Sequence, residues 1–207
     1  AAPVTVTVTV NPPISVKPGN SPATCPGGSV IVSASASGGD GSFTYAWTPG
    51  PLAGQSVSVT PPGTMYYTVS VTDGCGTPAA KDSVLVIVDP LPVVAFSADS
   101  TSGCYPVCVA FSDNSTIASG SITAWQWTFG DSNSSALQNP SNCYTTTGVY
   151  TVSLTATSDS GCSASFTDAN MITVYDHPHA QFSYAPNPVT IAAPTVAFTD
   201  NSTDLYG

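Results

Sequence analysis

The sequence predicts an all-β chain built from tandem β-sandwich domains. Helix-forming Glu and Arg are missing from its 207 residues, and all of the acidic side chains are Asp. β-Branched and aromatic residues recur between Gly, Pro and Asp, which is the punctuation that bounds short strands. One pattern of strand, polar residue and proline also returns along the chain, as expected for repeated domains.

The repeats can be placed from three equivalent polar residues. Asn11, Asp89 and Asp176 each end a β-type run and are followed, at once or after one residue, by proline. Their spacings of 78 and 87 residues match the size of one immunoglobulin-like sandwich. The sequence therefore predicts one domain over 11–89 and a second over 90–176, joined by short linkers that proline makes semi-rigid.

Both ends of the chain resemble parts of further units. In 1–10, valine alternates with threonine, as in the last strand of a preceding unit. Residues 177–207 repeat the opening of the second domain, because 196–203 nearly matches 109–116. We therefore expect the chain to be a window of a longer array of modules.

Within each domain, alternating side chains identify the principal strands. The run 150–157 places apolar residues on one face and Ser or Thr on the other, the period of a half-buried strand. Two sets of aromatic residues also share one parity, and we expect them in the cores rather than on a ligand-stacking surface. They are Phe43, Tyr45 and Trp47 in the first domain and Trp125, Trp127 and Phe129 in the second.

Charge and hydropathy exclude several classes of function. Lys17 and Lys81 are the only basic residues apart from two His, and the net charge is −10. Phosphate backbones and anionic membrane surfaces would be repelled, so we expect neither nucleic-acid binding nor membrane association. No apolar run of about 18 residues occurs, and Ala1 opens no charged-then-apolar signal, so we expect a mature secreted chain without membrane insertion.

Six cysteines in a chain of this size indicate an oxidising compartment. Each domain holds an even number, so each can form its own disulfides. Within the first domain Cys25–Cys75 is the one possible pair. The second allows three connectivities, of which we favour Cys104–Cys162 with Cys108–Cys143, since Cys104 opens the domain and Cys162 sits in a late hairpin near the same end.

Residues 127–132, with Asn139-Pro140 and 148–152 downstream, resemble the hallmark of the polycystic kidney disease (PKD) domain. That family has Trp-Asp-Phe-Gly-Asp-Gly, followed by Asn-Pro-x-His-x-Tyr and Gly-x-Tyr-x-Val. The resemblance spans most of 92–176 and implies an immunoglobulin-like sandwich. The first domain resembles a divergent PKD-like module.

The sequence departs from the PKD pattern at three positions. Thr128 stands in place of the first Asp, Ser132 in place of the last Gly, and Cys143 in place of His. The fold expectation is unaffected, but the departures weaken a metal role for this turn.

PKD-like modules recur in large secreted proteins of Bacteroidota, including gliding-motility adhesins exported by the type IX secretion system. The resemblance therefore implies an extracellular or cell-surface fibre protein. Its partners would be neighbouring modules of the same chain, other copies in a fibre, or surface glycans and proteins.

Calcium is the cofactor to consider, because related PKD modules bind it through clustered oxygen ligands. The candidates are Asp113, Asn114 and Asp131, although the following loop lacks an Asp-x-Asp-Gly run. The alternative is that Asp113 and Asp131 make turn hydrogen bonds. No cofactor is otherwise required.

We expect no catalytic activity. The chain has no Glu, its two histidines, His177 and His179, fall in a linker, and no nucleophile motif occurs. The histidines could pair on a metal, but exposed linker residues are the simpler interpretation.

Glycosylation is another open expectation. Three Asn-x-Ser/Thr sequons occur, and two Asp-Ser/Thr-aliphatic segments resemble O-glycosylation acceptors of Bacteroidota. The candidate residues are Asn114, Asn133, Asn201, Ser83 and Ser100.

Together these features predict a non-enzymatic stalk or filament segment of a large secreted bacterial adhesin. One alternative is a glycan- or protein-binding accessory module of a secreted hydrolase. Another is a fibre subunit in which strands are exchanged between chains.

Overall fold

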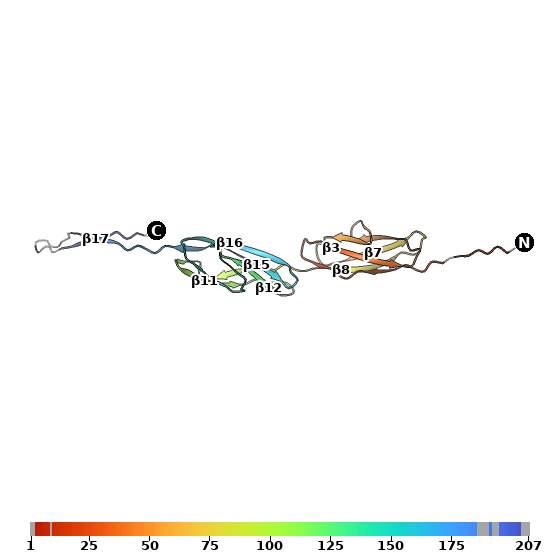
Figure 1. Cartoon of the computed structure of the whole chain (residues 1–207), viewed down its shortest axis with the longest axis horizontal. Helices are drawn as coiled ribbons and strands as arrows, with labels where there is room; N and C mark the ends of the chain where they lie inside the picture. The colour runs from red at the N-terminus through yellow and green to blue at the C-terminus, as the bar shows by residue number, and fades with distance from the viewer. Residues whose placement is uncertain (1–2, 9, 186–190, 192–194, 204–207) are drawn as a thin grey trace. The chain divides into compact units, whose positions relative to one another are not determined.

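The computed structural model describes residues 3–8, 10–185, 191 and 195–203, and all regular structure in them is β, which confirms the predicted fold class. Two compact units are formed (Figure 1). Unit 1 contains 1–91, 118–120 and 160–162, and unit 2 contains 92–117, 121–159 and 163–207. None of the described residues forms a helix that could cross a bilayer.

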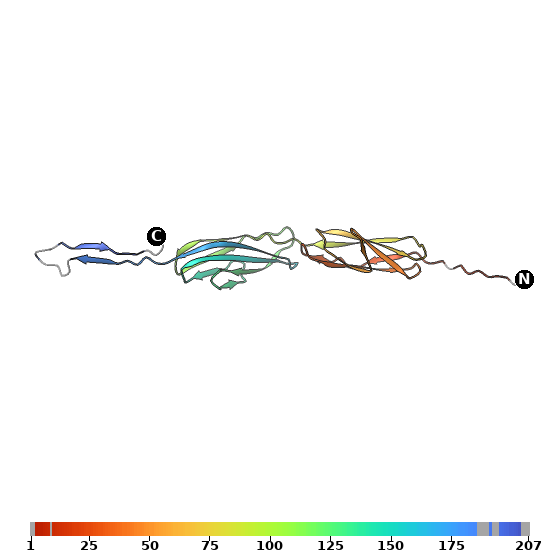
Figure 2. The ribbon, with the colours of Figure 1, turned by 90° about the horizontal axis from the view of Figure 1, so that it is seen from above.

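Unit 1 is a sandwich of two sheets, seen as two layers of strands in Figure 2. One sheet has the order β1-β3-β6 and the other β2-β8-β7-β4-β5. The strands are β1 (Ser15–Pro18), β2 (Ala23–Thr24), β3 (Val30–Ser37), β4 (Phe43–Thr48), β5 (Leu52–Ala53), β6 (Ser56–Val59), β7 (Met65–Asp73) and β8 (Ala80–Val88). The pairs are antiparallel except β2 with β8, which is parallel.

Unit 2 repeats this topology strand for strand, with sheets β9-β11-β14 and β10-β16-β15-β12-β13. Its strands are β9 (Phe96–Ala98), β10 (Ser102–Cys104), β11 (Val107–Asp113), β12 (Ile122–Thr128), β13 (Ser134–Ser135), β14 (Ser141–Tyr144), β15 (Gly148–Ser158) and β16 (Ser163–Tyr175). The single parallel pair, β10 with β16, is the equivalent of β2 with β8.

Alternation of buried and wet side chains builds each core. Along β15, Val152, Leu154 and Ala156 are fully buried, and the residues between them are only half-buried. Trp47 and Trp127 occupy equivalent core positions, and each indole N–H donates to a carbonyl, of Gly54 at 2.9 Å and of Leu137 at 3.0 Å. A buried indole keeps its polar atom satisfied in this way.

The expected aromatic core is formed in both units, with differing depth. Trp47, Trp127 and Phe129 are buried. The other three, Phe43, Tyr45 and Trp125, are half-buried and pack against the core clusters. No aromatic of the two parity sets is therefore fully exposed.

A hairpin of β17 (Phe182–Ala185) and β18 (Ala197–Asp200) follows unit 2's sandwich and copies the antiparallel pair that opens it, β9 with β11. Phe182 pairs with Asp200 as Phe96 pairs with Asp113. The side-chain bonds are also copied: Asn201 Nδ2 donates to Ser183 Oγ, and Asn114 Nδ2 to Ser97 Oγ, both at 3.0 Å. The near-identical sequences thus specify the same local structure twice.

Residues 3–8 and 10, expected as a strand of a preceding unit, pair with no strand of the described chain. Val4 and Val10 are 89% and 85% exposed. Their assignment to another unit stays a prediction. The remaining residues of that segment, 1–2 and 9, lie outside the described residues.

Candidate functional sites

Asp113 organises the first polar site, at the end of β11. Its carboxylate accepts hydrogen bonds from Trp125 Nε1 at 2.6 Å, Gln138 Nε2 at 3.2 Å and the Ser115 backbone N–H at 3.0 Å. Partial burial opposes ionisation, but the bonds from Ser115, Trp125 and Gln138 outweigh it and lower the pKa of Asp113. The carboxylate therefore fastens the end of β11 to β12.

Asp131 organises a second site, in the turn between β12 and β13. It accepts from the Asn133 backbone and side chain at 3.0 and 2.9 Å and from Asn142 Nδ2 at 2.7 Å. The turn needs left-handed backbone at Gly130, with φ +84°, where a Cβ would lie 2.7 Å from the Thr151 carbonyl oxygen. Ser132, at the motif's usual last glycine, keeps a left-handed φ of 75°.

These contacts bear on the calcium expectation. Asp113 and Asp131 have no hydrogen-bond partner in common, and each carboxylate already accepts three N–H bonds. Asn114 donates to Ser97 and does not face either acid through a hydrogen bond. Calcium binding here stays a prediction, and the arrangement favours the turn role.

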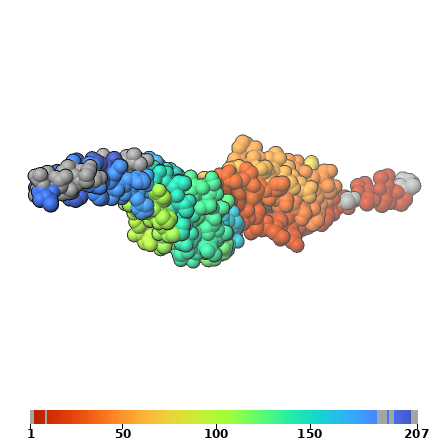
Figure 3. Space-filling view, turned by 60° about the vertical axis from the view of Figure 1, so that its left-hand side comes forward, coloured from red at the N-terminus to blue at the C-terminus, as the bar shows by residue number. Residues whose placement is uncertain are grey.

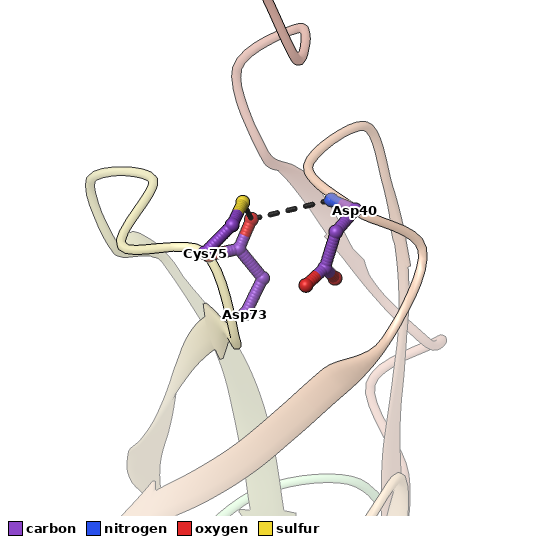
Figure 4. A group of neighbouring side chains, drawn as sticks. All are labelled: Asp40, Asp73 and Cys75. Atoms are coloured by element: carbon purple, nitrogen blue, oxygen red, sulfur yellow. Dashed lines mark hydrogen bonds between the residues drawn. The ribbon is translucent and has the colours of Figure 1, made fainter. Parts of the chain in front are cut away.

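A third polar site, not singled out from the sequence, joins Asp40, Asp73 and Cys75 (Figure 4). Their ligand-type atoms lie within 4.8 Å of one another, the only such group of three among the residues described. Asp73 accepts from the backbones of Asp40 and Thr77 and from the Cys75 thiol, at 3.3, 3.0 and 3.1 Å. The pKa of Asp73 is lowered to about 2, and the hydrogen bond from Thr77 is the largest cause.

The chemistry of this cluster fits a turn lock better than a metal centre. Two carboxylates suit a hard cation, whereas a thiolate suits a soft one, so the donor set is mixed. The carboxylate oxygens are also engaged, since Asp40 accepts from Ser42 at 2.8 Å and from Gly74 at 3.2 Å. The recurring Asp-Gly pairs near these loops were the signal available in the sequence.

Two disulfides are formed. Cys108 and Cys143 face each other in the register of β11 and β14, with Cα atoms 3.9 Å apart, and this is the pair expected from the sequence. The other joins Cys25 to Cys162, 5.6 Å apart at Cα and 137 residues apart in the chain. Cys162 belongs to the hairpin tip 160–162, which is part of unit 1.

The predicted Cys25–Cys75 and Cys104–Cys162 pairs are therefore wrong, for one physical reason. Cys25 follows β2 beside the end of β8, and Cys75 precedes the start of β8. A strand of nine residues spans roughly 30 Å, whereas bonded cysteines need Cα atoms about 4.4–6.8 Å apart. Cys104 and Cys162 likewise lie at opposite ends of β16, so Cys75 and Cys104 are both free and exposed.

The candidate glycosylation residues lie at or near the surface. Asn114, Asn133 and Asn201 are exposed, and each side-chain amide donates a hydrogen bond. Ser83 is exposed and shares a hydrogen bond with Thr68, whereas Ser100 is half-buried and donates to the Ser102 carbonyl. Carbohydrate at any of them stays a prediction.

The linker histidines are not brought together with other metal ligands among the described residues. His177 is exposed, and its ring lies 5.3 Å from that of Tyr105, centroid to centroid. Asp176 hydrogen-bonds the same tyrosine and raises its pKa. These contacts secure the end of β16.

Two open depressions lie on the described surface, of which the first exposes more apolar than polar surface and the second more polar than apolar. One lies over β12, β13 and β15, and another lies beside β3 and β6. The first is lined by Ala124, Trp125, Gln126, Ser134, Ser135, Ala136, Thr155 and Thr157. The face of unit 2 visible in Figure 3 has no deep opening. Ligand pockets in proteins are usually more enclosed than these open depressions.

Strand order, buried tryptophan and disulfide bonding define each unit as an immunoglobulin-like β-sandwich module. The model of the PKD domain family matches residues 90–174. This part of the chain therefore belongs to the PKD domain family, and unit 1 shares its strand order.

Solved structures similar to the chain include two PKD domains. The PKD1 domain of Epp from Vibrio anguillarum is 30% identical over 42% of this chain and 98% of that domain, with a TM-score of 0.37. The PKD1 domain of the Vibrio cholerae metalloprotease PrtV is 26% identical over 42% and 99%, with a TM-score of 0.36. A 1.5-MDa bacterial ice-binding adhesin is 14% identical over 87% and 70%, with a TM-score of 0.42.

Proposed function

We propose that this chain is a stalk or filament segment of a large secreted bacterial surface protein, and that it spaces other parts of that protein. The observation that carries the proposal is the repetition of one strand order in two successive units. The β17–β18 hairpin adds the opening of the same unit a third time. Modules that repeat without change of topology suit a spacer, because their number sets its length.

The surface supports a spacer more than a ligand-binding module. The core tryptophans Trp47 and Trp127 are buried, and the described depressions are lined mainly by Ser, Thr, Ala and Gln. PKD domains are in general non-catalytic accessory modules, which agrees with this role. Export by the type IX secretion system and a part in gliding motility are finer proposals, supported by the sequence resemblance alone.

The mass of the native polypeptide tests the proposal. Antibodies raised against this chain should detect, in extracellular and cell-surface fractions, a protein many times heavier than 20.9 kDa. A native protein of about that mass would contradict the array and favour strand exchange between copies. Selective binding of the chain to a glycan array would instead favour the accessory-module alternative.

Calcium has a separate test. If Asp113, Asn114 and Asp131 serve only their turns, millimolar calcium should leave the Tm of the chain unchanged, because a ligand that binds the folded state raises Tm. A rise that Asp131→Asn abolishes, and that Asp168→Asn leaves intact, would establish the metal site.

A further inference from the structure

Four of the six cysteines fall into two kinds by their position in the repeat. The first kind lies at the end of the short parallel strand, directly after β2 in unit 1 and as the last residue of β10 in unit 2. The Ile87 N–H donates to the Pro22 carbonyl at 3.0 Å, and the Thr173 N–H donates to the Thr101 carbonyl at 2.9 Å. Three residues beyond each acceptor stands a cysteine, Cys25 in unit 1 and Cys104 in unit 2. The two therefore occupy equivalent positions, beside the ends of β8 and β16.

The second kind of cysteine lies in the last hairpin loop of each sandwich, before its final strand; the tip of that loop in the second sandwich, 160–162, is grouped with unit 1. Cys75 lies between β7 and β8, and Cys162 lies between β15 and β16. The residue before a unit's opening proline approaches each sulfur. Asn11 Nδ2 donates to Cys75 Sγ at 3.0 Å, and the Asp89 carbonyl oxygen lies 3.9 Å from Cys162 Sγ.

The disulfide Cys25–Cys162 joins a cysteine of the first kind to one of the second kind, from successive repeats. One cysteine of each kind is left, Cys104 and Cys75, and both are exposed thiols. In each sandwich the two kinds lie at opposite ends of the final strand. A bond from Cys104 to a Cys75 in a following module would therefore run in the same direction along the repeats as the bond from Cys25 to Cys162. The bonded pair thus provides a template for what the free pair can do.

We propose that Cys104 is a disulfide site for a cysteine of the second kind in the module that follows it, and that Cys75 of a second copy of this chain, joined head to tail, supplies such a cysteine. The bond would repeat Cys25–Cys162 at the next junction, so the inference rests on the proposed spacer function and deepens it. A contact between two different surfaces of one chain does not close on itself, and it produces linear assemblies.

The chemistry is a thiol–disulfide exchange with a small disulfide such as oxidised glutathione as oxidant. The thiolate of Cys104 attacks the oxidant and releases one reduced thiol, which leaves a mixed disulfide. The thiolate of Cys75 from the second copy then attacks the Cys104 sulfur and releases the other. The two protein thiols lose two protons and two electrons, and one oxidant disulfide becomes two thiols.

Single-cysteine variants of the whole chain test the proposal. Cys75→Ser leaves only Cys104 free, and Cys104→Ser leaves only Cys75 free. Both residues are exposed, so the substitutions remove no core contact. One variant carries an affinity tag, the two are mixed equally in a glutathione redox buffer, and the linked dimers are counted by non-reducing electrophoresis and mass spectrometry.

The expected result is a several-fold excess of the heterodimer over either homodimer, with Cys75 and Cys104 in one cross-linked peptide. The unsubstituted chain should form a ladder of dimers, trimers and longer products, and the double variant should remain monomeric. Random pairing of the two variants, homodimers alone, or no dimers would overturn the proposal. The native-mass measurement is independent, so failure here is distinguishable from failure of the spacer function.

Discussion

Asp113 shows how one side chain can hold together elements that are distant in sequence. Its carboxylate receives bonds from Trp125 and Gln138, which come from β12 and from the loop after β13. The sequence offered Asp113 as a metal ligand or a turn residue, but it contained no sign of the tryptophan donor. Such a partner becomes visible only when the packing of the two sheets that contain β11 and β12 is known.

Asp113→Ala should lower the free energy of unfolding by about 1–3 kcal/mol, because it leaves the half-buried Trp125 N–H without its acceptor. Urea denaturation of the variant and the parent chain measures the difference. Asp168→Ala is the matched control and should stay within about 0.5 kcal/mol of the parent. Equal effects in the two variants would refute the anchoring role.

Acid should destabilise unit 1 through Asp73. The pKa of this carboxyl is lowered from 3.8 to about 2 in the folded chain, so its contribution is complete above pH 4 and is lost as the pH falls toward 2. The unfolding free energy should therefore fall over that range, and less steeply in Asp73→Asn. Denaturation curves at several pH values measure the slopes; identical slopes would show that Asp73 does not contribute.

Core side chains were the most predictable residues, because strand parity alone assigns a face. Parity placed Trp47, Trp127 and Phe129 inside, where they are. It could not distinguish these from Trp125, which shares their parity but is half-buried and turned to Asp113 through its indole N–H. How deeply a side chain is buried in a sandwich depends on the facing sheet. The local sequence pattern does not encode the position of that sheet.

At the scale of elements, the turn between β12 and β13 places Ser132 in a left-handed conformation at the position where the family motif has its last glycine. Ser132 has φ 75°, a left-handed conformation that costs a residue with a side chain about 1–2 kcal/mol. The family pattern predicted this turn, although Ser132 itself gave no signal of a left-handed residue. Its hydrogen-bonded neighbours Asp131 and Asn133 hold the turn in place.

Ser132→Gly should therefore stabilise the chain by up to about 1 kcal/mol, after the greater entropy of an unfolded glycine is subtracted. Thermal unfolding followed by circular dichroism measures the change as a rise in Tm. Ser134→Gly, in β13, should act in the opposite direction, since glycine weakens a strand. A fall in Tm for Ser132→Gly would mean that a contact of the serine side chain stabilises the fold by more than its left-handed backbone costs.

Disulfide pairing was the element-scale feature that the sequence predicted least well. Counting cysteines per domain gave even numbers, which favoured closure within each domain. The count ignores that strands are long and straight, so that two cysteines flanking one strand cannot meet. Cys108 and Cys143 escaped this error because they lie opposite each other on adjacent strands.

At the scale of the whole molecule, the Cys25–Cys162 bond alters the path of tension along the backbone. When the chain is pulled from its ends, force enters near Ala1, crosses between the two sulfurs and continues toward Gly207. Everything between Cys25 and Cys162 lies outside this covalent path while the bond is intact. The cores of both units contain strands that lie between these two cysteines, including β7 and β15.

Single-molecule stretching should reveal a hidden length that only reduction releases. The 137 residues spanned by the bond would add roughly 470 Å of contour at about 3.4 Å each. A reductant opens both bonds and should lengthen the fully extended chain by that amount. Cys162→Ser should lengthen it by roughly 350 Å at the same rise per residue, because the intact Cys108–Cys143 bond still closes off 35 residues. Cys108→Ser alone should add no length, because its bond lies inside the loop that Cys25–Cys162 closes. Equal extension with and without reductant would show that tension does not pass through the Cys25–Cys162 bond. A tether made this way has a fixed maximum reach, and its redox state determines whether strong shear stretches it or breaks it.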